Sequence, residues 1–240
     1  SATDIQAQTI PHLLEGKDVL GEAQTGTGKT AAFGLPALAK IDTAIKKPQL
    51  MVLAPTRELA MQVAEAIESF GKHMKGLRVA TLYGGQSYGP QFQQLERGAQ
   101  VVVGTPGRLM DHLRRKSLKL ADLRVCVLDE ADEMLKMGFV ENVDFIMSCL
   151  MHEHQTLMFS ATMPKEVERL SKSYLKDPIR SELIKGQSAP QSLNHHFQVI
   201  RHSDRLKMLE EYLKEEEIGQ AIIFCNSRAN GSRLIRELKR

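Results

Sequence analysis

Short apolar runs alternate with longer segments of helical periodicity over most of the chain. The runs lie at residues 19–20, 50–54, 79–82, 101–103, 125–128, 156–159 and 179–184. In several of them, such as 125–128, every position is apolar, which is typical of parallel strands covered on both faces. We therefore predict an α/β fold with a doubly wound parallel sheet, whose ligands bind at the carboxyl ends of the strands.

The segments between the runs predict helices. Residues 29–44 and 57–74 are two of them, the second because Leu59, Val63 and Ile67 recur at near-helical spacing. A further helix is predicted to open at Pro164, because proline suits a first helical turn.

The pattern changes at residues 185–194, which hold glycine, serine and proline with few apolar residues. Such composition is typical of a linker. We predict a first domain over residues 1–185, a linker over 186–195, and the incomplete start of a second α/β domain over 196–240.

In this second part we expect strands at 196–200 and 221–224 and helices at 203–217 and 228–239. Two strands and two helices are too few to close a sheet with both faces covered. The apolar run 221–224, if left at an open sheet edge, would favour self-association.

Composition adds little about partners. The net charge of the 240 residues is only +3, so it indicates neither a nucleic acid nor a membrane. Cys126, Cys149 and Cys225 lie far apart without metal-ligand spacing, which fits reduced thiols. The sequence has no apolar run of about 18 residues and no leader pattern, so we expect a soluble, cytoplasmic protein.

A glycine-rich segment follows the first apolar run. It consists of Ala23, Gln24, Thr25, Gly26, Thr27, Gly28, Lys29 and Thr30. Its glycines let backbone N–H groups turn toward phosphates, while Lys29 would reach the β and γ phosphates and Thr30 would ligate Mg²⁺. Ala23 stands where the general phosphate-loop pattern has glycine, and the alternative is a turn that only joins strand to helix.

Two adjacent carboxylates, Asp129 and Glu130, directly follow the apolar run 125–128. Acid pairs are common on solvated surfaces. Here, however, a buried strand precedes the pair and would place it at the carboxyl edge of the sheet, beside the terminal phosphate of a bound triphosphate. Asp129 is then expected to hold Mg²⁺, through water, and Glu130 to polarise the attacking water. Asp132 lies in the turn beyond the strand and is interpreted as a bonding partner of another motif.

Further motifs appear in a fixed order at residues 3–6, 55–60, 84–85, 105–108, 160–162 and 222–227. With the phosphate loop and Asp-Glu-Ala-Asp at 129–132, they make the chain resemble the DEAD-box ATP-dependent RNA helicases, closest to the bacterial cold-shock type. The resemblance covers nearly the whole chain. It implies a RecA-like first domain, ATP and Mg²⁺ as cofactors, and RNA as the partner.

The resemblance also implies residue roles. Gln6 would bond the adenine edge, and Ser160 and Thr162 would bond Asp132 and so link the nucleotide state to domain closure. The RNA backbone would be held by Pro55, Thr56, Arg57, Gly84, Gly85, Thr105, Pro106, Gly107 and Arg108. Such contacts would be independent of base sequence and selective for RNA. The alternatives are ordinary turns for the glycines and a helix cap for the hydroxyls.

The implied activity is RNA-stimulated ATP hydrolysis coupled to local separation of RNA duplexes and remodelling of RNA–protein complexes. The family's arginine-finger motif and the aromatic residue before Gln6 are not among the 240 residues. An arginine finger is worth roughly 10³ to 10⁵ in turnover in related enzymes, so we expect ATP binding, weak RNA binding and little turnover from this chain alone. The alternatives are an ATP-dependent RNA clamp without productive unwinding, and a DNA translocase.

Overall fold

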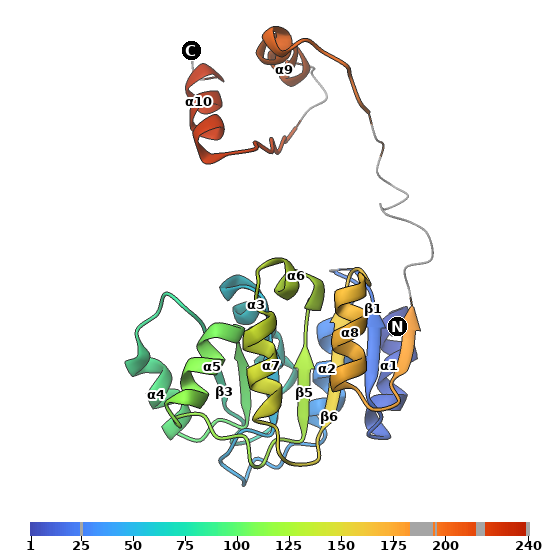
Figure 1. Ribbon diagram of the computed structural model, residues 1–240, viewed down its shortest axis with the longest axis vertical. Coiled ribbons are helices and arrows are strands. Elements are labelled where there is room, and N and C mark those ends of the chain that lie inside the picture. Colours follow the sequence, from blue (N-terminus) through green and yellow to red (C-terminus); the bar gives the residue numbers. More distant parts are fainter. Residues whose placement is uncertain (25, 183–193, 195, 215–218, 239–240) are drawn as a thin grey trace. The chain divides into compact units, whose positions relative to one another are not determined.

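A computed structural model describes residues 1–24, 26–182, 194, 196–214 and 219–238. Contacts within the chain divide it into two units, Ser1–Ser188 and Ala189–Arg240, and each is described by itself. The first unit contains a central sheet with helices on both sides (Figure 1).

The sheet has seven strands in the order β3-β4-β2-β5-β6-β1-β7, and all neighbouring pairs are parallel. The strands are β1 Val19–Glu22, β2 Leu50–Leu53, β3 Val79–Leu82, β4 Val101–Gly104, β5 Val125–Leu128, β6 Gln155–Ser160 and β7 Ile179–Glu182. The predicted doubly wound parallel sheet is confirmed.

Eight helices cover the two faces of this sheet. They are α1 Asp4–Leu14, α2 Lys29–Leu38, α3 Arg57–Phe70, α4 Tyr88–Glu96, α5 Pro106–Arg114, α6 Ala131–Lys136, α7 Val140–Ser148 and α8 Lys165–Tyr174. Side chains of α1, α2 and α3 belong to one apolar core, and those of α4 to α8 belong to another. Alternate residues of each central strand enter the two cores, as Leu50 and Met51 of β2 do, which explains the uniformly apolar runs.

Three predicted helices were too long, and the one predicted over 203–217 spans only Arg205–Leu213. The helix predicted over 29–44 ends at Leu38, because the side chain of Gln49 organises the following loop: its amide group bonds the backbone of Asp42 and Ile45. The helix predicted over 57–74 ends at Phe70. Gly71 then brings the chain so close to Leu77 that an added Cβ would lie 2.2 Å from its Cδ2 atom.

The second unit contains a 3₁₀ turn, η1 His202–Asp204, and two helices, α9 Arg205–Leu213 and α10 Arg228–Leu238. The strands predicted at 196–200 and 221–224 are wrong: these described residues form no strand. A strand needs a partner to satisfy its backbone, and Phe197 and Phe224, within these segments, remain 93% and 92% exposed.

Much of the predicted linker lies outside the described residues, so the domain boundaries remain a prediction. The expected self-association through the second part also remains a prediction. Among the helices of the described segments, none combines the length and apolar character that crossing a bilayer requires.

Candidate functional site

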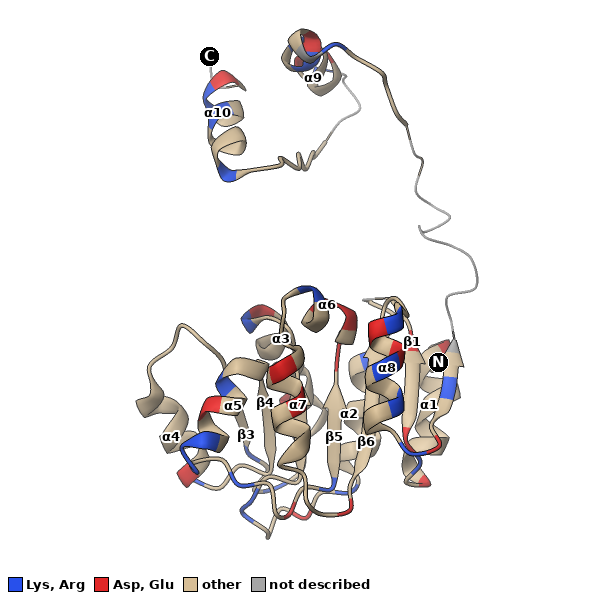
Figure 2. Cartoon of the chain, viewed as in Figure 1, with Lys and Arg blue, Asp and Glu red and all other residues tan. Residues whose placement is uncertain are grey.

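The predicted motifs follow six strands of one sheet and meet at its carboxyl edge. The phosphate loop follows β1, the acidic motif follows β5 and Ser160 closes β6, and these three strands are neighbours. Residues 55–57, 84–85 and 105–108, which we call the β2/β3/β4 loops, follow the three strands of the other half of the sheet. Figure 2 shows acidic residues at the turn between β5 and α6.

The phosphate loop leads into the first turn of α2, where unpaired backbone N–H groups favour an anion. Gly26 and Gly28 have φ of 84° and 91°, a region that strongly favours glycine. A Cβ on Gly26 would meet nothing within 4 Å, so the loop leaves open space at this point. The hydroxyl of Thr27 donates to the Gln24 carbonyl at 2.7 Å and braces the turn. Thr25 lies outside the described residues.

One predicted residue outside the loop, Gln6, and the two end residues of the loop have defined surroundings. Gln6 of α1 donates from Nε2 to the Gly28 carbonyl at 3.2 Å and accepts from the Thr3 N–H, so its amide lies against the loop. The N–H of Ala23 donates to the Ser160 carbonyl at 3.0 Å, which ties the start of the loop to β6. Thr30, at the second position of α2, is half-buried.

Lys29, the first residue of α2, and Asp129, which directly follows β5, form a buried charged pair. Their side-chain atoms Nζ and Oδ1 lie 3.9 Å apart, too far for a hydrogen bond, and neither atom has a hydrogen-bond partner among the described residues. Burial raises the pKa of Asp129 to about 6, although Lys29 acts in the opposite direction. Buried charges are normally paired or coordinate a metal. The pair therefore fits a triphosphate, whose oxygens would contact Lys29, and Mg²⁺, which Asp129 would hold.

Glu130 adopts a left-handed conformation, with φ of 55° and ψ of 54°. Such a conformation is uncommon for a residue other than glycine, and it clusters at functional sites. It lets the chain turn directly from β5 into α6. The Glu130 backbone also acts to lower the pKa of Asp129, in opposition to burial.

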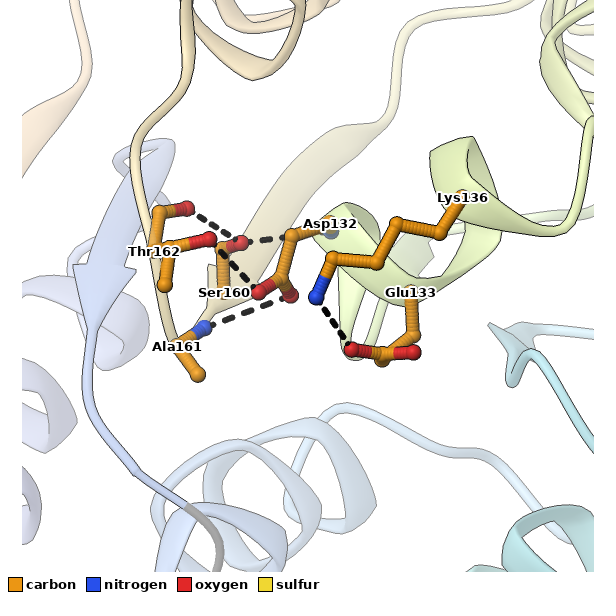
Figure 3. A network of polar contacts seen from close by, with 6 residues as sticks. All are labelled: Asp132, Glu133, Lys136, Ser160, Ala161 and Thr162. Atoms are coloured by element: carbon orange, nitrogen blue, oxygen red, sulfur yellow. Dashed lines mark hydrogen bonds and ion pairs between the residues drawn. The ribbon is translucent and has the colours of Figure 1, made fainter. Parts of the chain in front are cut away.

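Asp132 connects α6 to the end of β6 through three hydrogen bonds (Figure 3). Its N–H donates to Ser160 Oγ at 3.2 Å, and its carboxylate accepts from Thr162 Oγ1 at 2.8 Å and from the Ala161 N–H at 3.4 Å. Ser160 Oγ in turn donates to the Thr162 carbonyl at 2.7 Å. Burial alone would raise the pKa of Asp132, but the hydrogen bonds that its carboxylate accepts, that from Thr162 above all, outweigh burial and lower the pKa. The carboxylate is thus held ionised.

The β2 and β3 loops are in contact through the ring of Tyr83. Thr56 caps α3 by accepting from the Leu59 N–H at 3.2 Å, while Pro55 is buried behind it. The exposed Arg57 places its guanidinium 4.9 Å from the ring centre of Tyr83, the residue before Gly84. Such a contact holds the cation over the ring.

The glycines of the β3 and β4 loops leave open space. Added Cβ atoms on Gly84, Gly85 and Gly107 would meet nothing within 4 Å, and φ of Gly85 is 81°. Backbone N–H groups beside such glycines can approach a phosphate closely. Thr105 and Pro106 occupy the first positions of α5, as expected for a helix start.

Arg108 is fixed by protein contacts. Its Nη1 donates to the Gln86 carbonyl at 2.9 Å and to Gln91 Oε1 at 3.1 Å, and its guanidinium lies 4.2 Å from the ring centre of Tyr88. Sequence reasoning missed Tyr83, Gln91 and Tyr88. No sequence pattern singles out Gln91, because Gln93 and Gln94 lie in the same helix.

Comparison with known proteins agrees with these motifs. The family model described as DEAD/DEAH box helicase matches residues 3–170. The Escherichia coli protein named ATP-dependent RNA helicase DeaD is 49% identical over 224 residues, which are 93% of this chain and 36% of that protein. The Haemophilus influenzae protein of the same name is 50% identical over 225 residues.

A solved structure is also similar. The crystal structure of a DEAD box protein from the hyperthermophile Methanococcus jannaschii matches with a TM-score of 0.73 and 36% sequence identity. The match covers 99% of this chain and 63% of that chain. The present chain therefore spans only part of each relative's length, 36% for the bacterial ones.

Proposed function

The chain belongs to the DEAD/DEAH box helicase family, and on this basis we propose that it forms the ATP-binding part of an ATP-dependent RNA helicase. This enzyme would couple RNA-stimulated ATP hydrolysis to local separation of RNA duplexes and remodelling of RNA–protein complexes. The observation that carries the proposal is the buried Lys29–Asp129 pair, whose facing atoms have no hydrogen-bond partner among the described residues.

The nucleotide would bind along the β1, β5 and β6 ends of the sheet. Gln6 would bond the adenine edge, residues 23–30 would hold the phosphates, and Thr30 and Asp129 would hold Mg²⁺. Mg²⁺ would neutralise developing phosphate charge when bound. Glu130 would orient and polarise the attacking water, and its fixed left-handed backbone supports this role because a positioned base needs no reorganisation.

The bonds around Asp132 would link the nucleotide to domain movement. Asp132 is two residues from Glu130, while Ala23 of the phosphate loop bonds the carbonyl of Ser160. A shift of the phosphate loop would thus move Ser160. The hydroxyl of Ser160 accepts from the Asp132 N–H, so the backbone of Asp132 would move as well. Thr162 would hold the Asp132 carboxylate throughout.

RNA would bind over the β2/β3/β4 loops, next to the nucleotide on the same edge. Arg57 and Arg108 would contact phosphates, and the open glycines would let backbone N–H groups do so. These groups cannot read base edges, so binding would be independent of sequence, with 2′-OH contacts selecting RNA. Equal affinity for RNA and DNA strands of one sequence would contradict this part of the proposal.

Glu130→Gln tests the chemistry, because it keeps the shape of the side chain and removes the carboxylate. We expect single-turnover ATP hydrolysis in the presence of RNA to slow by about 100-fold or more, with the affinity for a fluorescent ATP analogue little changed. Glu133→Gln is the matched control, since this carboxylate lies three residues further on, in α6, and bonds Lys136. Unchanged hydrolysis in Glu130→Gln would refute the assigned role.

The 240 residues contain no arginine-finger motif, so turnover by this chain alone is expected to be slow. An ATP-dependent clamp without productive unwinding is the alternative. Measuring RNA affinity with an ATP analogue, with ADP and without nucleotide, alongside hydrolysis, separates the two. A clamp would show nucleotide-dependent affinity with hydrolysis no faster than in Glu130→Gln.

A further inference from the structure

Gln91 is a fully buried polar residue in the middle of α4, with 0% of its surface exposed. It does not belong to any motif recognised in the sequence. Its amide lies directly beneath two of the β2/β3/β4 loops, those that follow β3 and β4. A buried amide is costly unless its hydrogen-bonding capacity is used, so its partners indicate what it does.

The amide of Gln91 is saturated. Nε2 donates to the Tyr83 carbonyl at 3.0 Å and to Gln86 Oε1 at 2.8 Å. Oε1 accepts from Arg108 Nη1 at 3.1 Å and lies 2.9 Å from His112 Nε2. With two N–H donors and two acceptor positions occupied, this side chain has one orientation that satisfies all partners.

The partners of Gln91 come from different loops. Tyr83 and Gln86 bracket Gly84 and Gly85, so the two Nε2 bonds fix both ends of the β3 loop. The Tyr83 ring lies beneath Arg57, which extends the connection to the β2 loop. The bond from Arg108 fixes the β4 loop. A single amide thus joins, directly or through one residue, all three loops.

His112, in α5, helps to fix the orientation of the Gln91 amide. It is fully buried, packs edge-on against Phe92, and its Nδ1 lies 2.8 Å from Ser117 Oγ. Because Gln91 Oε1 can only accept, the proton of the neutral ring is placed on Nε2, where it donates to Gln91. The amide of Gln91 is therefore also held from the helix α5, through a buried histidine.

We propose that Gln91 is a positioning residue that holds the three β2/β3/β4 loops in one fixed arrangement matched to the backbone of a single RNA strand. It does not touch the RNA, because it is buried beneath the loops. The inference rests on the proposed RNA interface. A preorganised set of donors binds more tightly, since the loops need not be ordered when RNA arrives.

The test compares Gln91→Leu with a matched buried glutamine. Gln100 is 1% exposed, accepts from the Arg78 N–H at 2.9 Å and donates to the Thr43 carbonyl at 3.1 Å, but it lies at the opposite, amino end of β4. Gln100→Leu should therefore lower the melting temperature comparably without disturbing the loops. A labelled polyuridine strand, titrated in the presence of an ATP analogue, gives the RNA affinity of each variant.

We expect Gln91→Leu to weaken RNA binding about tenfold, with the affinity for a fluorescent ATP analogue within about twofold of wild type. Gln100→Leu should bind RNA like wild type. Hydrogen exchange of the amides at residues 83–87 should accelerate only in Gln91→Leu. Gln91→Glu keeps the acceptor for Arg108 and loses both donors, so its RNA affinity should fall between those of wild type and Gln91→Leu.

Wild-type RNA affinity in Gln91→Leu, or an equal loss in Gln100→Leu, would overturn the inference. Arg108→Ala distinguishes a failure of the positioning role of Gln91 from a failure of the proposed RNA interface. If Arg108→Ala weakens RNA binding and Gln91→Leu does not, the positioning role alone fails. If neither variant changes RNA affinity, the proposed interface fails and the positioning role fails with it.

Discussion

His112 should make the stability of the first unit depend on pH. Burial lowers the pKa of this residue from 6.5 to about 4, and the nearby Arg108 guanidinium acts in the same direction. The unfolded chain therefore takes up a proton on His112 near pH 6.5, whereas the folded chain does so only near pH 4. The stability that this residue contributes is fully present above pH 6.5 and falls as the pH drops toward 4.

The two pKa values set the size of the effect. Between about pH 7.5 and about pH 5, the free energy of unfolding should fall by about 2 kcal/mol through His112 alone, and by about 3 kcal/mol once the pH reaches 4. Other groups titrate over the same range, so the relevant quantity is the difference between wild type and a variant that cannot titrate at this position.

Urea unfolding of wild type and His112→Gln at the two pH values measures this difference. Glutamine can still donate to Gln91 and accept from Ser117, so the fold should survive at neutral pH. We expect wild type to lose about 2 kcal/mol more than His112→Gln on acidification. His73→Gln, at an exposed position in the same unit, should follow wild type. If the curves of wild type and His112→Gln are parallel, the burial argument is wrong.

Three further substitutions test separate contacts. Thr162→Val removes the 2.8 Å bond to the ionised Asp132 and should lower the free energy of unfolding by about 1 to 2 kcal/mol in urea. Gly104→Ala would place Cβ 2.4 Å from a backbone oxygen of β3 and should cost about 2 kcal/mol or more, whereas Gly107→Ala has open space and should not. Gly28→Ala combines φ of 91° with a Cβ 2.6 Å from the α1 glutamine, so fluorescent ATP-analogue affinity should fall at least about tenfold.

The opposite results are equally informative. An unchanged Thr162→Val would mean that water replaces the hydroxyl at no cost. Equal melting temperatures for Gly104→Ala and Gly107→Ala would show that β3 and β4 can separate without loss. Wild-type nucleotide affinity in Gly28→Ala would remove this glycine from the proposed phosphate contacts.

The sequence could predict the buried strands because their environment leaves little choice of residue. β5 is predicted with the bounds that the structure has, since a strand covered on both faces needs a continuous apolar run. The edge strand β3 is also predicted with its observed bounds, although its residues are alternately half-buried and buried. The run 221–224 has the same character but forms no strand. The local pattern shows that a segment can form a strand, whereas pairing depends on neighbours that are distant in sequence, as β4 and β5 are from β2.

Some residues of the candidate site could be predicted from the sequence, and others could not. Glycines, Lys29 and the acidic residues could be placed in advance, because backbone conformation and charge restrict these positions. Gln91 could not be distinguished from Gln93 and Gln94, which lie two and three residues away in the same helix. Its role depends on contacts made by Tyr83 and Arg108, which only the folded chain brings together.

The division of the sheet edge has a consequence for variation and engineering. The β2/β3/β4 loops and the nucleotide motifs are attached to two separate sets of adjacent strands, which touch only where β2 pairs with β5. Either set of loops can therefore be exchanged between relatives without altering a strand pair of the other set. A chimera that takes residues 55–57, 84–85 and 105–108 from a distant homologue would therefore change the proposed RNA contacts while leaving the proposed nucleotide site as it is.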